Sequence, residues 1–422
     1  MRAVSPSSPQ SRHAPPKSPA LWEWLYSVVG AGMWAFTRSR FRVEVAGNPL
    51  PRVGEGQLWI ATHRAETDVP LLAGLLYVHA GMWRGAPSRL HFAARDDLFR
   101  PGVVAAGIPL PGPLARLAWP LSPGPWLPRV RVHPIRRPTG LKLEQVLADL
   151  PGDTPLAGVL GPRLIALLDA GAARRGRPRP GIVDDVRDPR YARELWDDVA
   201  EADLVEGSGR EIWRSHIARA AGDVRRIVGL VRDGLPTLLF PEGRVSPDGS
   251  IGPISDVLDL VARRGRPRNI VPLGIAYDPL TRRRTEVTVG VGAPIQPGAE
   301  PMQTLAARAL RRAMPVTCGQ VLARFVTDAR RHDGTPATVG DLGRLLDQVV
   351  HTAANGNRPV VPSLLSPSRR PGRLREGLDA LERRGCISLL PEGAVRLDSE
   401  RIRADGVVQW LATEDRDLWR SE

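Results

Sequence analysis

The sequence is poor in cysteine and lacks a long hydrophobic run. Its 422 residues include two cysteines, Cys318 and Cys386, which are too few for a disulfide framework or a structural zinc site and fit a reducing cytoplasm. The apolar run Leu25–Phe36 has 12 residues, whereas a membrane-spanning helix needs about 20. With 42% hydrophobic residues and a mean hydropathy of −0.19, the chain is neither a polytopic membrane protein nor mainly disordered.

Lysine is also scarce, because it occurs only at Lys17 and Lys142, so arginine carries nearly all the positive charge. The 59 basic residues exceed the 45 acidic ones, which gives a formal net charge of +14. Such a surplus favours anionic partners such as acidic lipids, nucleic acids or phosphorylated substrates, unless it only solvates the surface. The length predicts two or three domains.

The N-terminal region predicts a flexible tail followed by a helix at the lipid interface. Residues 1–20 contain five prolines, five serines and no acidic residue, so we expect a disordered tail that is not a secretory signal. A helix over residues 21–37 contains three tryptophans and is followed by Arg38 and Arg40. This composition is typical of a helix lying in the membrane interface, and an ordinary buried first helix is the alternative.

Strands and helices alternate as far as about residue 297, which predicts an α/β fold with a mixed sheet flanked by helices. The strands are expected at Val43–Val45, Leu58–Ile60, Phe92–Arg95, Arg129–Arg137, Thr237–Phe240, Ile270–Tyr277 and Glu286–Val291. The helices are expected at Val69–Val78, Leu141–Leu150 and Ile217–Val231. Between them, the proline-rich segment 101–128 predicts a hydrophobic loop, and the polar segment of about 151–210 predicts an insertion.

The remaining residues, 300–422, predict a small, mostly helical C-terminal domain. Its helices are expected at Leu305–Met314, Gln320–Arg331, Val339–Val350 and Leu374–Arg384. Two short strands, Ile387–Leu390 and Ala394–Leu397, then flank a Pro-Glu-Gly turn as a hairpin. Helices followed by a short hairpin indicate a winged-helix-like module.

The pattern H-x4-D at His63 and Asp68 is suited to general-base chemistry. It follows a predicted buried strand and precedes an apolar helix, so the carboxylate can hold one imidazole nitrogen while the other takes a proton. General-base action of this kind is typically worth about 10²- to 10⁴-fold in rate. His91 and Asp96 have the same spacing, but His91 begins a predicted strand and Asp96 falls beyond it, so we expect a structural or surface role there.

Two further motifs predict an anion site. Phe240–Ser250 (FPEGRVSPDGS) begins at the end of a buried strand, where open α/β sheets bind ligands, and its glycine allows backbone N–H groups to approach an anion. Within it, Arg244 could bind phosphate through paired hydrogen bonds. Arg136 and Arg137 end another predicted strand, where they either clamp a phosphate or face solvent. A second Pro-Glu-Gly, at residues 391–393, is expected to be a plain hairpin turn.

In this order, H-x4-D, Ile-Arg-Arg, Phe-Pro-Glu-Gly and the segment Ile270–Leu273 (IVPL) resemble the motif set of the glycerolipid acyltransferases. The resemblance covers about residues 22–297, and the Ile-Arg-Arg variant and His63–Arg64 are similar to the glycerol-3-phosphate branch. The sequence departs from the common pattern at Thr62, where the family often has Asn, and at Arg244, where E-G-R-V-S replaces E-G-T-R-S.

The resemblance implies acyl transfer from acyl-CoA or acyl carrier protein to glycerol-3-phosphate in phospholipid synthesis, with no metal or other cofactor. His63 would deprotonate the acceptor hydroxyl, with Asp68 orienting it, and neither cysteine would take part. The implied acceptor site consists of Arg136, Arg137, Glu242, Gly243, Arg244 and Pro272. The enzyme would act as a peripheral or monotopic protein on the cytoplasmic face of an anionic membrane.

Three alternatives stay open. The acceptor could be 1-acylglycerol-3-phosphate or another lysophospholipid, with the same chemistry. The net charge and the winged-helix-like module could instead indicate a DNA-binding protein, although the module lacks an obvious aromatic stacking platform and its hairpin tip carries Glu392. An acyltransferase-like protein without activity is the third, and the intact His63, Asp68 and Glu242 argue against it.

Overall fold

The computed structural model describes residues 19–85, 88–99, 124–137, 141–148, 150–298, 300–328 and 337–419. The predicted N-terminal tail, apart from residues 19 and 20, lies outside the described residues, as does the predicted proline-rich loop as far as residue 123.

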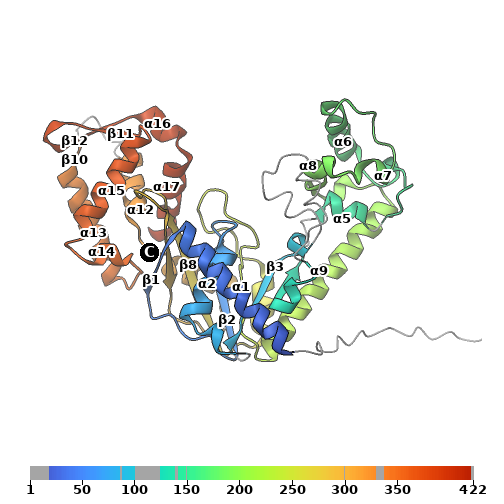
Figure 1. The fold of residues 1–422 in the computed structure, drawn as a ribbon, viewed down its shortest axis with the longest axis horizontal. Helices are drawn as coiled ribbons and strands as arrows, with labels where there is room; N and C mark the ends of the chain where they lie inside the picture. Colours follow the sequence, from blue (N-terminus) through green and yellow to red (C-terminus); the bar gives the residue numbers. More distant parts are fainter. Residues whose placement is uncertain are drawn as a thin grey trace, which may run out of the picture.

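A seven-stranded sheet forms the centre of the molecule, in the order β1-β9-β8-β2-β7-β3-β4 (Figure 1). The strands are β1 (Arg42–Gly47), β2 (Gln57–Ala61), β3 (His91–Arg95), β4 (Val132–Ile135), β7 (Thr237–Leu239), β8 (Asn269–Asp278) and β9 (Glu286–Val291). The β8–β9 pair is antiparallel and the other five neighbouring pairs are parallel. The prediction of an α/β fold with a mixed sheet is therefore confirmed.

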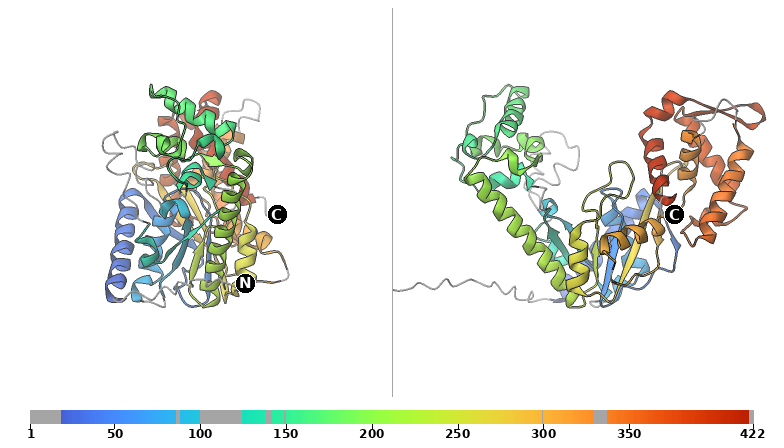
Figure 2. Two further views of the ribbon diagram at one scale, coloured as in Figure 1. Left: turned by 90° about the vertical axis from the view of Figure 1, so that its right-hand side faces the viewer. Right: turned by 180° about the vertical axis from the view of Figure 1, so that it is seen from behind.

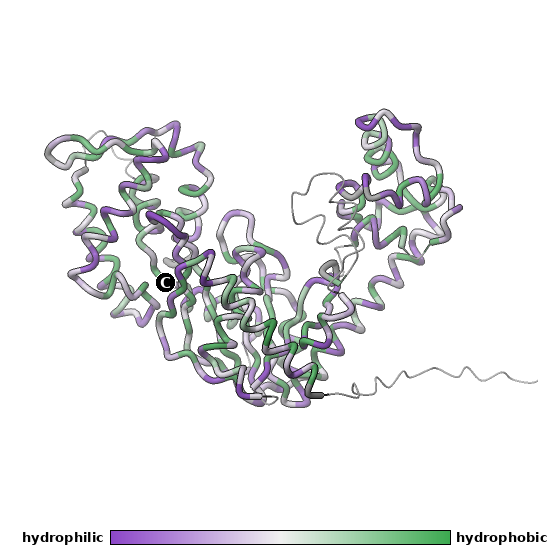
Figure 3. Tube along the Cα trace, viewed as in Figure 1, coloured by the Kyte–Doolittle hydropathy of each residue, from purple (hydrophilic) through white to green (hydrophobic). Residues whose placement is uncertain are grey.

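Helices cover both faces of this sheet, and for that reason its central strands are apolar on both sides. Trp59 and Ala61 of β2 point to one face, where α1 (Pro19–Arg40) and α2 (Asp68–His79) pack. Leu58 and Ile60 point to the other face, where α9 (Ser208–Arg232), α10 (Asp256–Gly265) and α11 (Met302–Ala313) pack. Figure 3 shows hydrophobic residues concentrated along the strands between these layers.

Two helical regions rise on either side of the sheet (Figures 1 and 2). One follows β4 and has its own hydrophobic core, to which residues between Leu141 and Trp213 contribute. It contains β5 (Leu141–Lys142), α5 (Leu143–Ala148), α6 (Pro162–Arg174), α7 (Val183–Val186), α8 (Ala192–Leu195), β6 (Asp198–Val199) and the start of α9. We call residues 141–213 the middle module. Its core begins at Leu141, ahead of the insertion expected from about residue 151, because Leu141, Leu143 and Val146 are buried within it.

The other region is the C-terminal region, which continues from α11. It contains α12 (Cys318–Asp328), β10 (Ala337–Thr338), α13 (Val339–Asn355), α14 (Pro362–Leu365), α15 (Arg370–Arg383), β11 (Ile387–Leu389), β12 (Ala394–Leu397), α16 (Ser399–Ala404) and α17 (Gly406–Trp419). β11 and β12 form the predicted hairpin, and β10 adds a third strand beside β12. No helix in the described part of the chain is both long and apolar enough to cross a membrane.

Candidate active site

His63 lies just beyond the carboxyl end of β2, in the middle of the sheet. β2 is hydrogen-bonded to β7 on one side and to β8 on the other, in parallel. The carboxyl ends of β2, β7, β3 and β4 therefore share one edge of the sheet, and the end of β4 leads into the middle module (Figure 1). Open α/β sheets bind ligands at this edge.

Asp68, the first residue of α2, holds the imidazole of His63. Its Oδ2 lies 3.0 Å from His63 Nδ1 and accepts hydrogen bonds from the backbone N–H groups of Arg64 (2.5 Å) and Ala65 (2.9 Å). Because an ionised carboxylate only accepts, Nδ1 carries the hydrogen and Nε2 keeps its lone pair. His63 and Asp68 are buried, and the ring of Phe240 lies 4.5 Å from the imidazole ring. The predicted pair is thus assembled in the geometry that a base and its orienting acid require.

Glu242 supports the backbone of His63. Its Oε1 accepts the His63 N–H at 2.9 Å and its Oε2 accepts the Gly252 N–H at 2.7 Å, so one carboxylate joins the loop after β2 to the loop after β7. Burial raises the pKa of Glu242, while the nearby Arg64 guanidinium and the two N–H donors oppose that shift. Gly243 follows with φ of +67°, a left-handed conformation that glycine adopts without strain. The Glu-Gly pair therefore shapes this corner of the site.

A cavity of about 290 Å³ opens beside His63. Its floor is mostly apolar, formed by side chains such as Val69, Leu239 and Leu258. Its charged lining consists of Glu66, Arg95, Arg136 and Arg137, together with the imidazole of His63. The cavity thus places a base between apolar walls and guanidinium groups, a combination that suits a substrate with both an acyl chain and an anionic group.

Arg136 and Arg137 reach this cavity from the end of β4 but differ in their contacts. The Arg136 Nη1 donates to Asp223 of α9 at 2.8 Å, and its Nε lies 3.6 Å from Asp96. Two carboxylates therefore hold Arg136 in place. His216 of α9 donates to the backbone carbonyl of Arg137 at 2.7 Å, and the Arg137 side chain also lines the cavity.

Two of the predicted site residues lie elsewhere. Arg244 is exposed on the loop after β7, and Pro272 lies inside β8 in register with Ile60. Neither belongs to the described residues that line the cavity. The structure therefore brings together His63, Asp68, Glu242, Gly243 and the two arginines after β4, but leaves these two apart.

The second H-x4-D pattern, at His91 and Asp96, and the second Pro-Glu-Gly, at residues 391–393, both make contacts typical of structural residues. The His91 ring stacks on that of His133 with a centroid distance of 5.1 Å, and Asp96 accepts a hydrogen bond from Gln145 at 2.7 Å. The second Pro-Glu-Gly forms a 3₁₀ turn between β11 and β12, as expected for a hairpin.

Arg95 and Tyr277 were not singled out from the sequence. Arg95 ends β3 at the same sheet edge and lines the cavity, and its Nη1 donates to Glu66 at 3.2 Å. The signal that pointed to Arg137, a basic residue ending a predicted strand, applies equally to Arg95. Tyr277 lies within β8, and its hydroxyl donates to Asp68 Oδ1 at 2.7 Å. A tyrosine in an apolar strand is ordinary, so no sequence signal distinguished it.

Comparisons with known proteins add little. No family model matches the sequence, and no curated protein matches it. Among solved structures, the crystal structure of the 1-acyl-sn-glycerophosphate (LPA) acyltransferase PlsC from Thermotoga maritima aligns with 69% of this chain and 77% of that one, at 12% identity and a TM-score of 0.30. A likeness at this level does not establish an activity.

Proposed function

We propose that this protein transfers a fatty acyl group from a thioester, acyl-CoA or acyl carrier protein, to the hydroxyl group of glycerol-3-phosphate. The observation that carries the proposal is the buried His63–Asp68 pair at 3.0 Å, which opens onto a cavity with apolar walls and guanidinium groups. The order of the sequence motifs supports the same reaction.

In the proposed reaction His63 acts as the general base. Its Nε2 takes the proton of the acceptor hydroxyl, and the oxygen forms a bond to the thioester carbonyl carbon. When the tetrahedral intermediate collapses, the C–S bond breaks and the leaving thiolate takes that proton from the imidazolium. Asp68 stabilises the imidazolium and holds the ring in the productive tautomer. No acyl-enzyme forms, so neither buried cysteine takes part.

The acceptor phosphate is proposed to bind Arg137, with Arg95 at the rim of the same cavity. Arg136 has a supporting part, because Asp223 and Asp96 already hold its guanidinium. The apolar walls would hold the acyl chain of the donor. They could equally hold the chain of a 1-acylglycerol-3-phosphate acceptor, which keeps that acceptor as the second candidate.

Purified protein should be assayed with labelled CoA and carrier-protein thioesters against both acceptors. We expect transfer to glycerol-3-phosphate to be the faster reaction, and Arg137→Ala to raise the acceptor KM by about 10- to 100-fold, the effect of losing one hydrogen bond between charged groups. Arg232→Ala, an exposed arginine at the end of α9, is the control. Transfer only to the lysophospholipid would select the second candidate, and no transfer to either acceptor would refute the proposal.

We also propose that α1 docks on an anionic membrane. Exposed apolar side chains recur along one side of this helix at Leu21, Trp24, Val28 and Phe36, while its other side packs on α2. Exposed arginines, Arg38 and Arg40, follow at its end. A helix with such a stripe can lie in the interface, and each nearby basic residue adds about 1 kcal/mol on an acidic surface.

Co-sedimentation with phosphatidylglycerol-containing vesicles tests this docking. We expect binding that weakens as salt is raised and that the double variant Trp24→Ser/Val28→Ser loses. Leu365→Ser, which changes an equally exposed apolar residue of the C-terminal region, should bind as the wild type does. Equal loss in both variants, or no effect of either, would contradict docking through α1.

A further inference from the structure

Tyr277 contacts the side of Asp68 that faces away from His63. Its hydroxyl donates to Asp68 Oδ1 at 2.7 Å and lies 3.0 Å from Thr67 Oγ1. Oδ2 of the same carboxylate takes the three donors described above, so donors from the loop after β2 and from strand β8 surround Asp68. Asp68 is fully buried, so this hydrogen bond is made without competition from bulk solvent.

The tyrosine is a permanent donor in this position. Burial, the largest cause, and then the charge of Asp68 raise the pKa of Tyr277 well above its ordinary value. The phenol therefore stays protonated throughout the physiological range. A hydrogen bond to an ionised carboxylate both favours its charge and fixes its orientation.

The C-terminal helix α17 packs beside the site. Glu414 of α17 is fully buried, and its charge is the smallest of the causes that raise the pKa of Tyr277. Trp410, one turn earlier, lies against the loop after β7, where a methyl group added at Gly249 would come within 2.9 Å of the Trp410 carbonyl oxygen. The carbonyl of Gly249 in turn accepts a hydrogen bond from Arg64, the neighbour of His63. Helix α17 therefore packs against the loop whose Gly249 carbonyl holds Arg64.

We propose that Tyr277 is a positioning residue for the His63–Asp68 pair. This inference rests on the proposed function, in which His63 is the general base and Asp68 orients it.

Tyr277→Phe predicts a shift of defined sign. In this variant Asp68 loses a donor and becomes more basic, so it stabilises the imidazolium and the apparent pKa of His63 rises. A merely structural defect would lower activity without moving the titration.

The kinetic test measures kcat, KM and the pH dependence of kcat. For Tyr277→Phe we expect kcat to fall about tenfold, the size of one hydrogen bond to a charged group, with KM nearly unchanged and the acidic limb moved to higher pH. Tyr26→Phe is the matched control, because Tyr26 is also a buried tyrosine, and its hydroxyl lies 3.4 Å from the Leu90 carbonyl, away from His63. An unchanged kcat and an unmoved limb in Tyr277→Phe would overturn the positioning role.

A second measurement separates this inference from the proposed function. Titration of ¹⁵N-labelled histidine rings by NMR follows the eight imidazoles directly, and His63 is assigned by its loss in His63→Ala. If the wild type proves inactive, a raised pKa of His63 in Tyr277→Phe but not in Tyr26→Phe would still support the positioning role, while the proposed reaction would fail. If Tyr277→Phe does not fold, Thr67→Val, which removes the other partner of the Tyr277 hydroxyl, provides the test, and an unshifted His63 there would contradict the inference.

Discussion

The C-terminal region and the middle module attach to the sheet in different ways. Residues of α12, α13 and α15 join the hydrophobic cluster that contains Leu58 and Ile60 of β2, so the sheet and the C-terminal region share one core. The middle module keeps a core of its own, and Arg136 and Gln145 contact Asp96 where it meets the sheet. The C-terminal region is therefore continuous with the core of the sheet, whereas the middle module packs around a separate core beside it.

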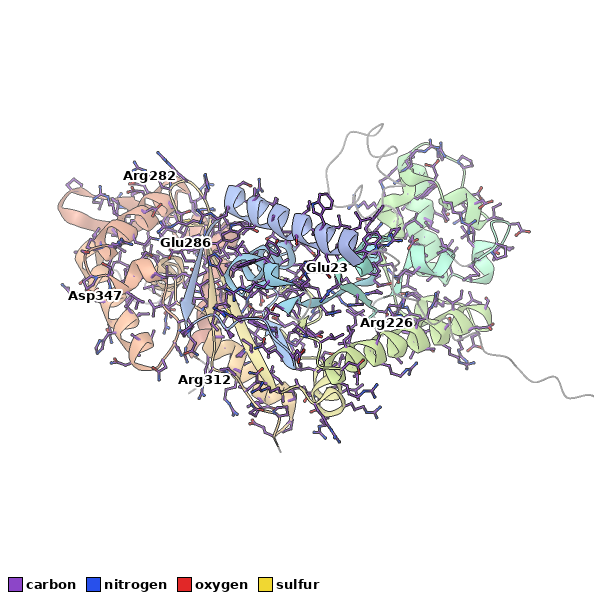
Figure 4. The ribbon with its side chains drawn as sticks, turned by 60° about the horizontal axis from the view of Figure 1, so that its bottom comes forward. Glu23, Arg226, Arg282, Glu286, Arg312 and Asp347 are labelled. Atoms are coloured by element: carbon purple, nitrogen blue, oxygen red, sulfur yellow. The ribbon has the colours of Figure 1, made fainter. Side chains whose placement is uncertain are left out.

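A buried cluster of charges reinforces the junction between the sheet and the C-terminal region. Arg373 of α15 lies 2.6 Å from Asp278 of β8 and 3.2 Å from Glu286 of β9, and all three side chains are buried. Figure 4 shows Glu286 where the sheet meets the C-terminal helices. In the middle module Arg163 pairs with Asp203 at 2.7 Å, but the side chain of Arg163 is 51% exposed.

The largest expected effect on stability comes from a substitution that breaks the buried charge cluster of Arg373, Asp278 and Glu286. Arg373→Met should lower the free energy of unfolding by about 3–5 kcal/mol, because it leaves two buried carboxylates without their cation. Arg163→Met should cost no more than about 1 kcal/mol, since the guanidinium of Arg163 is half exposed and its ion pairs lie at the surface. Urea unfolding measures both values, and equal losses would contradict the difference between the regions.

The hydrophobic cores can be compared by a pair of matched substitutions. Leu322→Ala in α12 and Leu168→Ala in α6 each remove a buried side chain and should each cost about 2–5 kcal/mol in the core concerned. Hydrogen exchange should rise in β8 as well as in the C-terminal helices for Leu322→Ala. For Leu168→Ala it should rise within residues 141–213 alone. Faster hydrogen exchange in β2 of the Leu168→Ala variant would show that the two cores unfold together.

Two buried histidines in the neighbouring strands β3 and β4 should make the stability of the protein sensitive to acid. Burial, the largest cause, lowers the pKa of His91 to about 3 and that of His133 to about 4, from an ordinary value of 6.5. The folded state therefore binds fewer protons than the unfolded state, so stability is complete above pH 6.5 and is lost as the pH falls toward 4. The loss amounts to at most about 1.4 kcal/mol per pH unit for each histidine.

Unfolding midpoints between pH 7 and pH 4 measure this loss. His133→Gln should flatten the curve relative to the wild type, whereas His351→Gln, at an exposed position of α13, should leave it unchanged. A wild-type stability that does not vary over this range would contradict the buried neutral pair.

The smallest expected effect concerns the thiols at the C-terminal junction. Burial raises the pKa of Cys318 to about 12, and Cys386 is also buried. Iodoacetamide, which needs a thiolate, should therefore leave acyl transfer and stability unchanged at pH 7.5. Rapid alkylation accompanied by loss of activity would indicate that the junction opens or that a thiol takes part.

Several parts of this structure could be predicted from the sequence because the signals are local. Strands β2 and β8 and the helix after His63 could be predicted from their hydrophobic runs. The H-x4-D pattern places a base and an acid only five residues apart. β4 is shorter than the predicted strand Arg129–Arg137, because a 3₁₀ turn precedes it and Arg131 has a left-handed φ of +64°.

The remaining features depend on contacts between distant segments. Arg373 and Asp278 are 95 residues apart, and neither differs in sequence from an exposed charge. The helix Leu143–Ala148 is amphipathic whichever core it faces, so its place in the middle module could not be predicted. Arg244 met the chemical requirement for binding phosphate, but the direction of its loop leaves it exposed.

The most direct test of the central claim is single-turnover acyl transfer by the His63→Ala variant. We expect a fall of about 10²- to 10⁴-fold in the rate of the chemical step, the usual contribution of a general base. His79→Ala, at the exposed end of α2, should react at the wild-type rate. A His63→Ala variant that transfers acyl groups as fast as the wild type would contradict the account.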